Sequence, residues 1–386
     1  MSDKNNKALK LGWRRVKFGN VVRQCKEKAT PETSGLERYI AGDHMDTNDL
    51  RLRRWGEIGS DYLGPAFHMR FKPGQVLYGS RRTYLRKVAV ANFEGICANT
   101  TFVLESKAPQ ELMPEFLPFL MQTEEFNSYS VKHSKGSVNP YINFSDLERF
   151  EFELPPISEQ ARIVRLLQEV EASAEEIRNL RGECIRLIEA TFQENVWGNQ
   201  SLPRAPINSI ADLNPSVAPL SEDDPFIPMD ALDVWTQEID IPRIEKKGKR
   251  GGIKAQGGDI LMARITPCLE NGKIAQVPVS VKKCGGSTEF IVFRAKVGTD
   301  QQFLYYLITS RVFHSQAAGT MSGSTGRQRA SASDVGRIIV PILPLIKQIE
   351  ICGQIKQISK IKEATNSRLL RLSQMKLAVL IGVGSE

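Results

Sequence analysis

Apolar residues recur at helical spacing along two long stretches that contain no proline, residues 157–196 and 345–381. An apolar side chain returns every three, four or seven positions with charged residues between, as on a helix with one buried stripe. About 40 residues, at roughly 1.5 Å each, form a rod of roughly 60 Å. One stripe cannot bury itself, so the pattern predicts two long helices that pair. Two unrelated surface helices on a compact domain are the alternative. The residues expected in the seam are Ile163, Leu166, Val170, Ile177, Leu180 and Leu187 in the first stretch and Ile351, Ile355, Ile358, Leu369 and Leu372 in the second.

Short apolar runs bounded by glycine and proline precede each long stretch and predict strands, with a few short helices between them. The order of these patterns occurs twice. Residues 39–46 (YIAGDHMD) correspond to residues 226–233 (FIPMDALD), 187 positions later, and residues 74–78 (GQVLY) correspond to residues 258–262 (GDILM), 184 positions later. Because the offset stays nearly constant, the chain is predicted to be a diverged tandem repeat.

The length of 386 residues exceeds one ordinary core and is typical of two domains with connecting helices. The net charge of +8, from 52 basic and 44 acidic residues, favours a polyanionic partner only weakly. The six cysteines form no CxxC pair, and the basic N-terminus lacks the apolar core of a signal peptide. No apolar run approaches the roughly 20 residues of a membrane span. We therefore expect free thiols, a cytoplasmic location and no membrane.

Basic residues alternate with aromatic and small residues in the predicted loops of both halves. Arginine can hold guanine through two hydrogen bonds, asparagine can pair with adenine, and either cation can hold a phosphate. Glycine in such a loop lets the backbone approach a groove closely. A solvated basic face is the alternative. The residues predicted to contact DNA are Tyr78, Arg81, Arg82, Tyr84, Arg86, Lys87, Lys132, Lys135, Ser137 and Asn139 in the first half and Lys246, Lys247, Arg250, Arg264, Ser324, Thr325, Arg327, Gln328 and Arg329 in the second.

Signatures of catalysis are weak throughout the chain. The phosphate-binding pattern GxxxxGK[ST] is absent. Residues 223–226 (DDPF) approach the signature of an adenine methyltransferase but lack its second proline, and Asp240 with residues 245–247 (EKK) only loosely matches a metal-dependent nuclease site. The four histidines are scattered. We expect no catalytic residue, no metal ligand and no cofactor site in this chain.

Three segments carry a resemblance to a known family: residues 71–77 (FKPGQVL), residues 135–142 (KGSVNPYI) and residues 154–163 (LPPISEQARI). With them, the chain resembles the DNA-specificity subunit of type I restriction–modification systems along nearly its full length. The last segment is the most specific, because members carry a similar stretch at the head of a long helix. The second copy, residues 342–349 (ILPLIKQI), keeps a proline and the glutamine but has Lys347 where the first has Glu159.

The resemblance implies an α/β (α+β) fold with a pseudo-twofold tandem repeat. Target recognition domains at residues 1–154 and 199–342 would be separated by an antiparallel coiled-coil pair of spacer helices at residues 155–198 and 343–386. Each domain would read one half of a split site on double-stranded DNA. Two modification subunits would dock on the spacer and domains and methylate adenine with S-adenosylmethionine, and in this family two motor-nuclease subunits can join the complex.

Two other functions remain open on the sequence. A stand-alone DNA-modifying or DNA-cleaving enzyme would act on DNA without a partner. A coiled-coil scaffold that joins two protein-binding domains would bind partners but show no sequence-dependent, salt-sensitive DNA affinity.

Overall fold

The computed structural model describes residues 9–60, 62–233, 239–240, 243–244, 252–324 and 328–383. It divides into two compact units. Unit 1 comprises Met1–Ile177 and Ser367–Glu386, and unit 2 comprises Arg178–Asn366. The division cuts both long helices, α5 (Ile157–Phe192) and α9 (Leu345–Val383), so each unit holds a part of each helix. The predicted partition into two globular domains and two separate helices stays a prediction.

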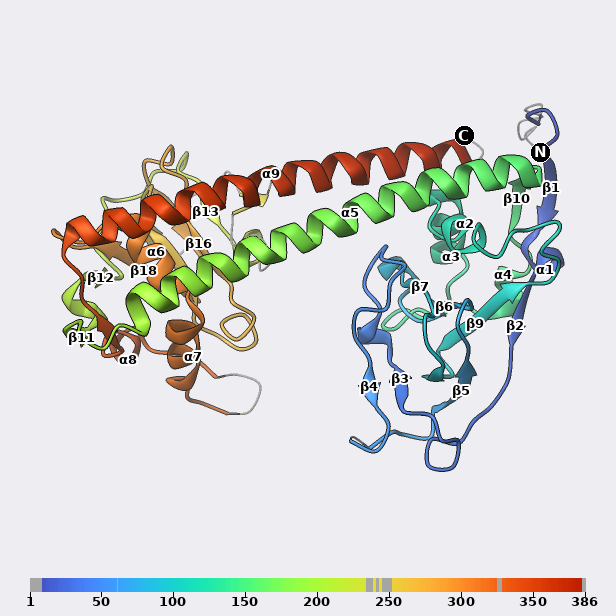
Figure 1. Cartoon of the computed structure of the whole chain (residues 1–386), viewed down its shortest axis with the longest axis horizontal. Coiled ribbons are helices and arrows are strands. Elements are labelled where there is room, and N and C mark those ends of the chain that lie inside the picture. Colours follow the sequence, from blue (N-terminus) through green and yellow to red (C-terminus); the bar gives the residue numbers. More distant parts are fainter. Residues whose placement is uncertain are drawn as a thin grey trace. The chain divides into compact units, whose positions relative to one another are not determined.

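Unit 1 contains three sheets with the strand orders β2-β9-β6-β7, β4-β3-β8-β5 and β1-β10 (Figure 1). In the second sheet β3 and β8 run parallel, while β5 is antiparallel to β8. The strands are β1 (Arg14–Lys17), β2 (Val22–Cys25), β3 (Arg38–Ile40), β4 (Gly56–Glu57), β5 (Phe67–Phe71), β6 (Val76–Gly79), β7 (Val88–Val90), β8 (Gly95–Ala98), β9 (Thr101–Ser106) and β10 (Glu151–Leu154). The shorter helices are α1 (Phe18–Val21), α2 (Leu117–Leu120), α3 (Glu124–Lys132) and α4 (Phe144–Leu147).

Unit 2 repeats this topology, except that its second sheet has three described strands where that of unit 1 has four. Its sheets have the orders β12-β18-β15-β16, β13-β17-β14 and β11-β19, and β13 again runs parallel to β17 while β14 is antiparallel to it. The strands are β11 (Arg204–Pro206), β12 (Ala211–Leu213), β13 (Phe226–Ile227), β14 (Ile253–Ala255), β15 (Ile260–Ala263), β16 (Ile274–Gln276), β17 (Cys284–Gly286), β18 (Phe290–Ala295) and β19 (Ile339–Pro341). The shorter helices are α6 (Gln301–Thr309), α7 (Arg311–Gly319) and α8 (Ala332–Val335). The predicted duplication of the chain is therefore present in the topology of the two units.

The strand that leads to the candidate site is buried on both faces in each unit. In β6, Val76 and Tyr78 belong to one apolar cluster and Leu77 to another. In β15, Leu261 likewise packs into a different cluster from its two neighbours. Because successive side chains of a strand point to opposite faces, each strand joins two cores of its unit and is firmly held. The loop that follows such a strand therefore starts from a fixed position.

A buried glutamine fastens the start of α5 to unit 1. The side-chain oxygen of Gln160 accepts the amide of Met113 at 2.9 Å, and its nitrogen donates to the carbonyls of Glu111 and Pro155, both at 2.8 Å. Gln160 is fully buried, so these bonds replace the water that its polar atoms would otherwise bind. The start of α5 is thereby fixed against the segment before α2.

The start of α9 in unit 2 is fastened in the same way. The side-chain oxygen of Gln348 accepts the amide of Asp300 at 2.8 Å, and its nitrogen donates to the carbonyls of Gly298 (3.3 Å) and Leu343 (2.8 Å). This buried glutamine lies 188 positions after Gln160, and its partners lie 187 or 188 positions after those of Gln160. The two units thus repeat a side-chain network as well as a strand order.

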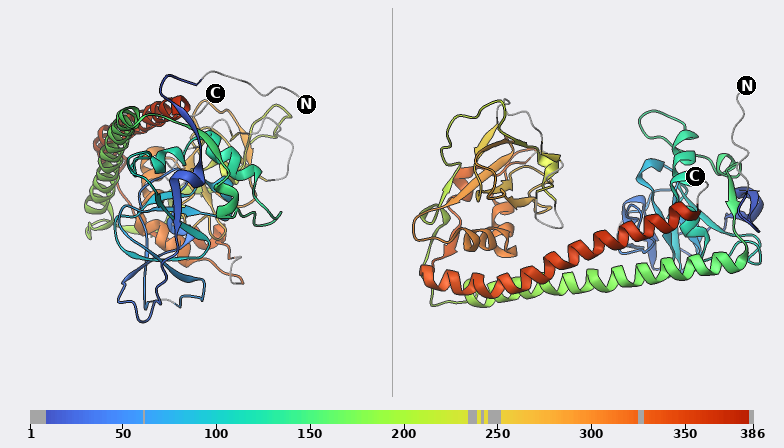
Figure 2. Two further views of the ribbon diagram at one scale, coloured as in Figure 1. Left: turned by 90° about the vertical axis from the view of Figure 1, so that its right-hand side faces the viewer. Right: turned by 90° about the horizontal axis from the view of Figure 1, so that it is seen from above.

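Within unit 1 the two long helices lie side by side and run in opposite directions (Figures 1 and 2). Leu380 and Val383 of α9 join the apolar cluster that contains Ile163 of α5, and Lys376 forms an ion pair with Glu171 at 2.5 Å. The two helices are therefore antiparallel within unit 1.

The predicted seam is only partly correct. Ile163, Ile351 and Ile355 are buried, and Val170, Ile177, Ile358, Leu369 and Leu372 are half-buried. The seam prediction is wrong for Leu166, Leu180 and Leu187, which are 38%, 45% and 54% exposed, while the role of the spacer residues in binding partners stays a prediction. The buried face of α5 includes Val164 and Leu167 beside Ile163, so it is turned away from residue 166 and from the positions at heptad spacing after it.

Candidate nucleic-acid interface

Two loops meet at the end of β6 in unit 1. The first, residues 80–87, follows β6, and the second, residues 133–142, follows α3. The amide of Arg82 donates to the carbonyl of Pro140 at 2.6 Å, which joins the two loops through their backbones. We call this pair of loops the two-loop frame of unit 1.

The second loop of this frame is a tight hairpin. Lys135 and Tyr141 exchange backbone hydrogen bonds of 2.7 and 2.9 Å, and Gly136 at its tip has φ +87°, which glycine adopts at little cost. The amide of Ile142 then donates to the carbonyl of Ser80 at 3.0 Å. The hairpin is therefore bonded to the end of β6 through both Ser80 and Arg82.

A chain of hydroxyl groups supports the frame from the core. The Tyr78 hydroxyl lies 2.5 Å from the Ser130 hydroxyl, the Ser134 hydroxyl donates to the Ser130 carbonyl at 2.8 Å, and the Thr83 and Ser134 hydroxyls lie 2.8 Å apart. Tyr78 is fully buried, and burial raises its pKa to about 12. The prediction that Tyr78 contacts DNA therefore requires correction: both faces of β6 are covered, and the side chain supports the frame from within.

Two cations of this frame, and one at the end of α3 just before its second loop, are available to a ligand. The side chains of Arg81, Arg82 and Lys132 are exposed and make no hydrogen bond or ion pair with another residue that the structure describes. Tyr84, 53% exposed, lies in the same loop as the two arginines. Unpaired cations next to an exposed aromatic ring are suited to a phosphate backbone or to base edges.

The remaining predicted cations of the first loop have partners within unit 1. Arg86 forms an ion pair with Glu124 of α3 at 2.7 Å. The Lys87 ammonium donates to the carbonyl of Gly42, and partial burial lowers the pKa of Lys87. These two side chains hold the loop in place, and to contact a ligand they would first have to release their partners.

The tip of the hairpin presents small polar groups. Ser137 and Asn139 are exposed, and Tyr141 is 43% exposed. Lys135 forms an ion pair with Asp146 at 2.8 Å, and this hydrogen bond lowers the pKa of Asp146. Lys135 is therefore partly committed to holding the hairpin.

Unit 2 has an equivalent two-loop frame, whose described residues are 264–272 after β15 and 320–324 and 328–330 after α7. The amide of Ala330 donates to the carbonyl of Arg264 at 2.8 Å, as Ile142 does to Ser80.

The other backbone bonds of the unit 1 frame also recur in unit 2. The amide of Thr266 donates to the carbonyl of Gln328 at 3.1 Å, as Arg82 does to Pro140. Ser322 and Arg329 exchange bonds of 3.1 and 2.9 Å, as the two arms of the hairpin do in unit 1.

The side chains of the second frame differ from those of the first. Arg329 donates from Nε and Nη2 to the Glu289 carboxylate at 2.8–3.1 Å, which lowers the pKa of Glu289. Arg264 is half-buried, and its Nε has no hydrogen-bond partner among the described atoms. Ser324 is exposed and Gln328 is half-buried.

Some predicted residues lie outside the described part of the chain, namely Lys246, Lys247, Arg250, Thr325 and Arg327. Residues 245–247 of the weighed nuclease pattern also lie there. Asp240, the described member of that pattern, forms an ion pair with Arg243 at 2.9 Å. Among the described residues, no group of three or more histidine, cysteine or acidic residues could hold a metal ion, and no helix has the length and apolar character needed to cross a membrane.

Sequence reasoning missed the residues that hold the frames. Thr83 and Ser134 form the hydroxyl link, and Asp146 and Glu289 are the anionic partners of the hairpins. The position of Tyr141 just after Asn139-Pro140 is the sequence signal that could have identified it as part of the returning arm of a turn.

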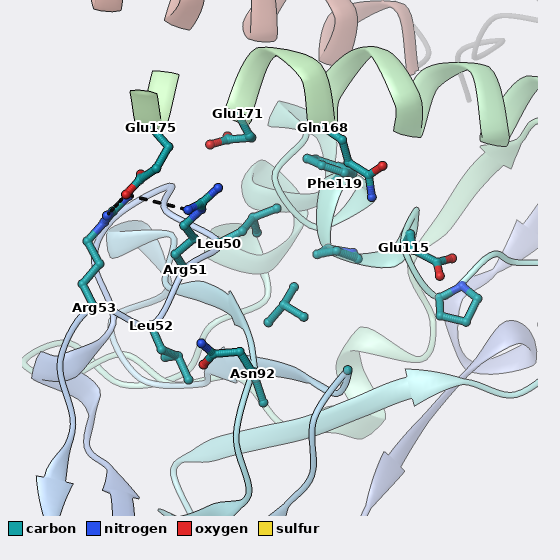
Figure 3. Close-up of a pocket in the computed structure, with 15 residues that line it drawn as sticks. Leu50, Arg51, Leu52, Arg53, Asn92, Glu115, Phe119, Gln168, Glu171 and Glu175 are labelled. Atoms are coloured by element: carbon teal, nitrogen blue, oxygen red, sulfur yellow. Dashed lines mark hydrogen bonds and ion pairs between the residues drawn. The ribbon is translucent and has the colours of Figure 1, made fainter. Parts of the chain in front are cut away.

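A cavity of about 740 Å³ lies elsewhere in unit 1, between α2, the segment before β4 and α5 (Figure 3). Leu50, Leu52 and Phe119 are among its apolar lining residues. At one side Arg53 binds Glu175 of α5 through two hydrogen bonds of 3.0 and 2.6 Å, which raise the pKa of Arg53.

A second cavity, of about 520 Å³, occupies the matching place in unit 2. Its lining residues Gln302 and Tyr306 lie 187 positions after Glu115 and Phe119 of the first, and Glu363 of α9 lies 188 positions after Glu175 of α5. The contact of the globular part with a long helix is thus duplicated, but the arginine clasp is described only in unit 1.

Comparison with known families identifies the first half of the chain. The family described as the type I restriction modification DNA specificity domain matches residues 12–182. The EcoDI specificity subunit of Escherichia coli is 28% identical over 165 residues, and the EcoEI specificity subunit of the same species is 29% identical over 154 residues. These matches cover 43% and 38% of this chain and only 36% and 26% of the relatives' own lengths.

Solved structures are similar over the full chain. The type I restriction-modification S subunit from M. genitalium is 13% identical with a TM-score of 0.56, covering 99% of this chain and 98% of its own. A chain from a structure describing assembly and conformational transition of the type I R-M system is 20% identical with a TM-score of 0.50, covering 98% of both. These likenesses concern the mixed α/β fold with its long helices. The match of residues 12–182 shows a type I restriction modification DNA specificity domain in the first half of the chain.

Proposed function

We propose that this chain reads a bipartite sequence on double-stranded DNA, with one two-loop frame on each half of the site, and directs partner subunits to it. The chain itself is not an enzyme in this proposal. The observation that carries the proposal is the duplicated frame: the same backbone hydrogen bonds join two loops at the end of an equivalent strand in unit 1 and in unit 2. A duplicated frame with different side chains is suited to reading two different half-sites in the same way.

The proposed DNA contacts are the exposed side chains of these frames. Arg81, Arg82 and Lys132 bring unpaired positive charge, and neutralising phosphates supplies much of the affinity of proteins for DNA. Ser137 and Asn139 at the hairpin tip add groups that can reach base edges.

The long helices act as the spacer in this proposal. They would pair as an antiparallel coiled coil and hold two target recognition domains in a pseudo-twofold arrangement, so that helix length sets the gap between half-sites. The antiparallel contact of α5 and α9 within unit 1 and the repeated glutamine anchors support this view.

The partners follow from the same proposal. Two modification subunits would dock on the helices and domains, bind S-adenosylmethionine and methylate an adenine in each half-site, and motor-nuclease subunits can complete a restriction complex. The location would be the cytoplasm, where the genome is accessible.

Mapping of methylated adenines in the host genome, with and without the gene for this chain, tests the proposal. We expect one bipartite motif to lose its methylation when the gene is deleted and to regain it on complementation. An unchanged set of modified motifs would refute the proposal. Methylation or cleavage by the purified chain alone would instead show a stand-alone enzyme, and partner binding without salt-sensitive, sequence-dependent DNA affinity would show a scaffold.

A further inference from the structure

Among the described residues, four that are not glycine have a positive φ: Asn48, Arg82, Arg86 and Asn214. Asparagine tolerates this left-handed region because its short side chain bonds locally, but arginine rarely adopts it. Both arginines lie in the first loop of the unit 1 frame, with φ of +49° and +48°. Glycine would adopt these angles at lower cost, so something other than the turn itself has retained an arginine at each position.

The side chain of Arg86 has a role within the protein. Its guanidinium binds both oxygens of Glu124 at 2.7 and 2.9 Å, which ties the first loop to α3. Its carbonyl also accepts the amide of Asn48 at 3.2 Å. The unfavourable backbone at Arg86 is therefore offset by contacts that fix the loop.

The side chain of Arg82 has no such role. It is exposed and has no hydrogen-bond or ion-pair partner among the residues that the structure describes. Its backbone, however, is held on both sides: its amide donates to Pro140 at 2.6 Å and its carbonyl accepts the amide of Leu85 at 2.8 Å. The structure thus fixes the point from which this side chain leaves the backbone but gives its guanidinium no partner.

The fixed backbone and the exposed guanidinium of Arg82 favour a base contact over a phosphate contact. A phosphate can be held by any flexible cation nearby, and such a contact does not require a fixed or unfavourable backbone. Two parallel hydrogen bonds to one base edge need a planar donor that leaves the backbone at a defined place. Guanine presents its O6 and N7 in this geometry in the major groove.

Resting on the function proposed above, we propose that Arg82 is a specificity-determining residue that reads a guanine in the half-site bound by unit 1. Arg86 is the positioning residue that keeps the loop against α3. The neighbouring Arg81 and Lys132 contact phosphates.

The test uses genome-wide mapping of methylated adenine in cells that carry the full chain and its modification partner. Arg82→Lys keeps the charge but cannot make the paired contact, and Arg82→Gly removes the side chain from a backbone that glycine accepts. We expect both variants to relax one guanine position, with discrimination there falling about tenfold or more, while the other half of the motif stays unchanged. Arg70→Lys, an arginine of β5 outside the frame, is the control and should keep the wild-type motif.

The outcomes separate this inference from the function on which it rests. A motif that depends on the chain but is identical in wild type and both Arg82 variants would overturn the base contact and leave the proposed function intact. Equally reduced methylation at every site, with no relaxed position, would make Arg82 a phosphate contact and also overturn the inference. A wild-type chain without any dependent motif would overturn both.

Discussion

The two frames share a backbone and differ in their side chains. In unit 1 the returning arm of the hairpin carries Tyr141, and three nearby cations have no hydrogen-bond or ion-pair partner among the described residues. In unit 2 the equivalent position is Arg329, which is held by Glu289. Backbone hydrogen bonds do not depend on the identity of the side chain. A frame held by them can therefore keep its shape while its exposed side chains differ. This separation of shape from surface is what two reading sites with different targets require.

The helix anchors show the opposite behaviour. Gln160 and Gln348 are the same residue type in the same network, although the loops around the frames have diverged. Each glutamine satisfies one amide and two carbonyls in a buried place, and few other side chains offer both an acceptor and two donors there. The glutamine network is thus the same in both units, whereas the side chains of the two frames differ.

Loss of either glutamine anchor should have the largest effect. Gln160→Leu and Gln348→Leu leave buried backbone groups without a partner, so each should lower the free energy of unfolding by about 3 kcal/mol. Urea unfolding of the full chain, followed by circular dichroism, measures the change.

Exposed glutamines on the same helices serve as the controls for that experiment. Gln168→Leu on α5 and Gln354→Leu on α9 should change stability by less than about 0.5 kcal/mol. If only one of the two substitutions lowered the free energy of unfolding, the two networks would share their geometry but not their contribution to stability.

Weakening the ion pairs that hold the two hairpins, Lys135–Asp146 in unit 1 and Arg329–Glu289 in unit 2, should have the next largest effect. The loss of DNA affinity should differ between the two units. Glu289→Gln weakens a contact with several hydrogen bonds that holds the returning arm of the unit 2 frame, so the loss of this fixed arm should reduce DNA affinity about tenfold. Asp146→Asn weakens one hydrogen bond with Lys135 and should reduce the affinity about threefold. Arg329 lowers the pKa of Glu289 from 4.5, so this ion pair is complete at pH 6–8 and is lost only as the pH falls through that lowered value.

Fluorescence anisotropy with the methylated-motif duplex at pH 7 measures both affinities. Glu183→Gln, which disrupts an exposed pair with Arg186 outside the frames, should leave binding unchanged. Equal losses of DNA affinity for Glu289→Gln and Asp146→Asn would contradict the prediction that the ion pair with more hydrogen bonds contributes more.

The sequence predicted the repeat because constant offsets depend only on local order, while the DNA contacts it names in the loops stay predictions. Constant offsets located equivalent strands, and glycine with small residues located the hairpin tips. Tyr78 was misassigned because a strand pattern does not show whether both faces are covered. Leu166, Leu180 and Leu187 were misassigned because heptad spacing describes a stripe without showing which side the partner occupies. The Arg86–Glu124 pair joins residues 38 positions apart, and no local pattern carries that contact.

The cavities give a smaller test of the comparison between the units. Glu175→Gln in unit 1 weakens the clasp with Arg53, and since both groups are partly exposed we expect a loss of about 1 kcal/mol in stability. Glu363→Gln, the exposed equivalent in unit 2, should change stability by less than about 0.3 kcal/mol. Thermal unfolding of both variants measures the difference, and matching losses would contradict an asymmetric clasp.

The smallest expected effect concerns a single charge at matching places in the two frames. Arg81 and Ile265 occupy the same bridge position, the first opposite Tyr141 and the second opposite Arg329. If Arg81 holds one phosphate, Arg81→Ala should reduce the slope of log K against log salt by about 0.9 and weaken binding a few-fold for every sequence alike. Ile265→Ala should leave the slope unchanged, and Ile265→Arg should increase it by about the same amount if the two frames lie on DNA in the same way. Anisotropy titrations between 50 and 300 mM salt measure these slopes. A larger slope for Ile265→Arg would show that the two frames lie on DNA in the same way. An unchanged slope would show that they share only their backbone structure.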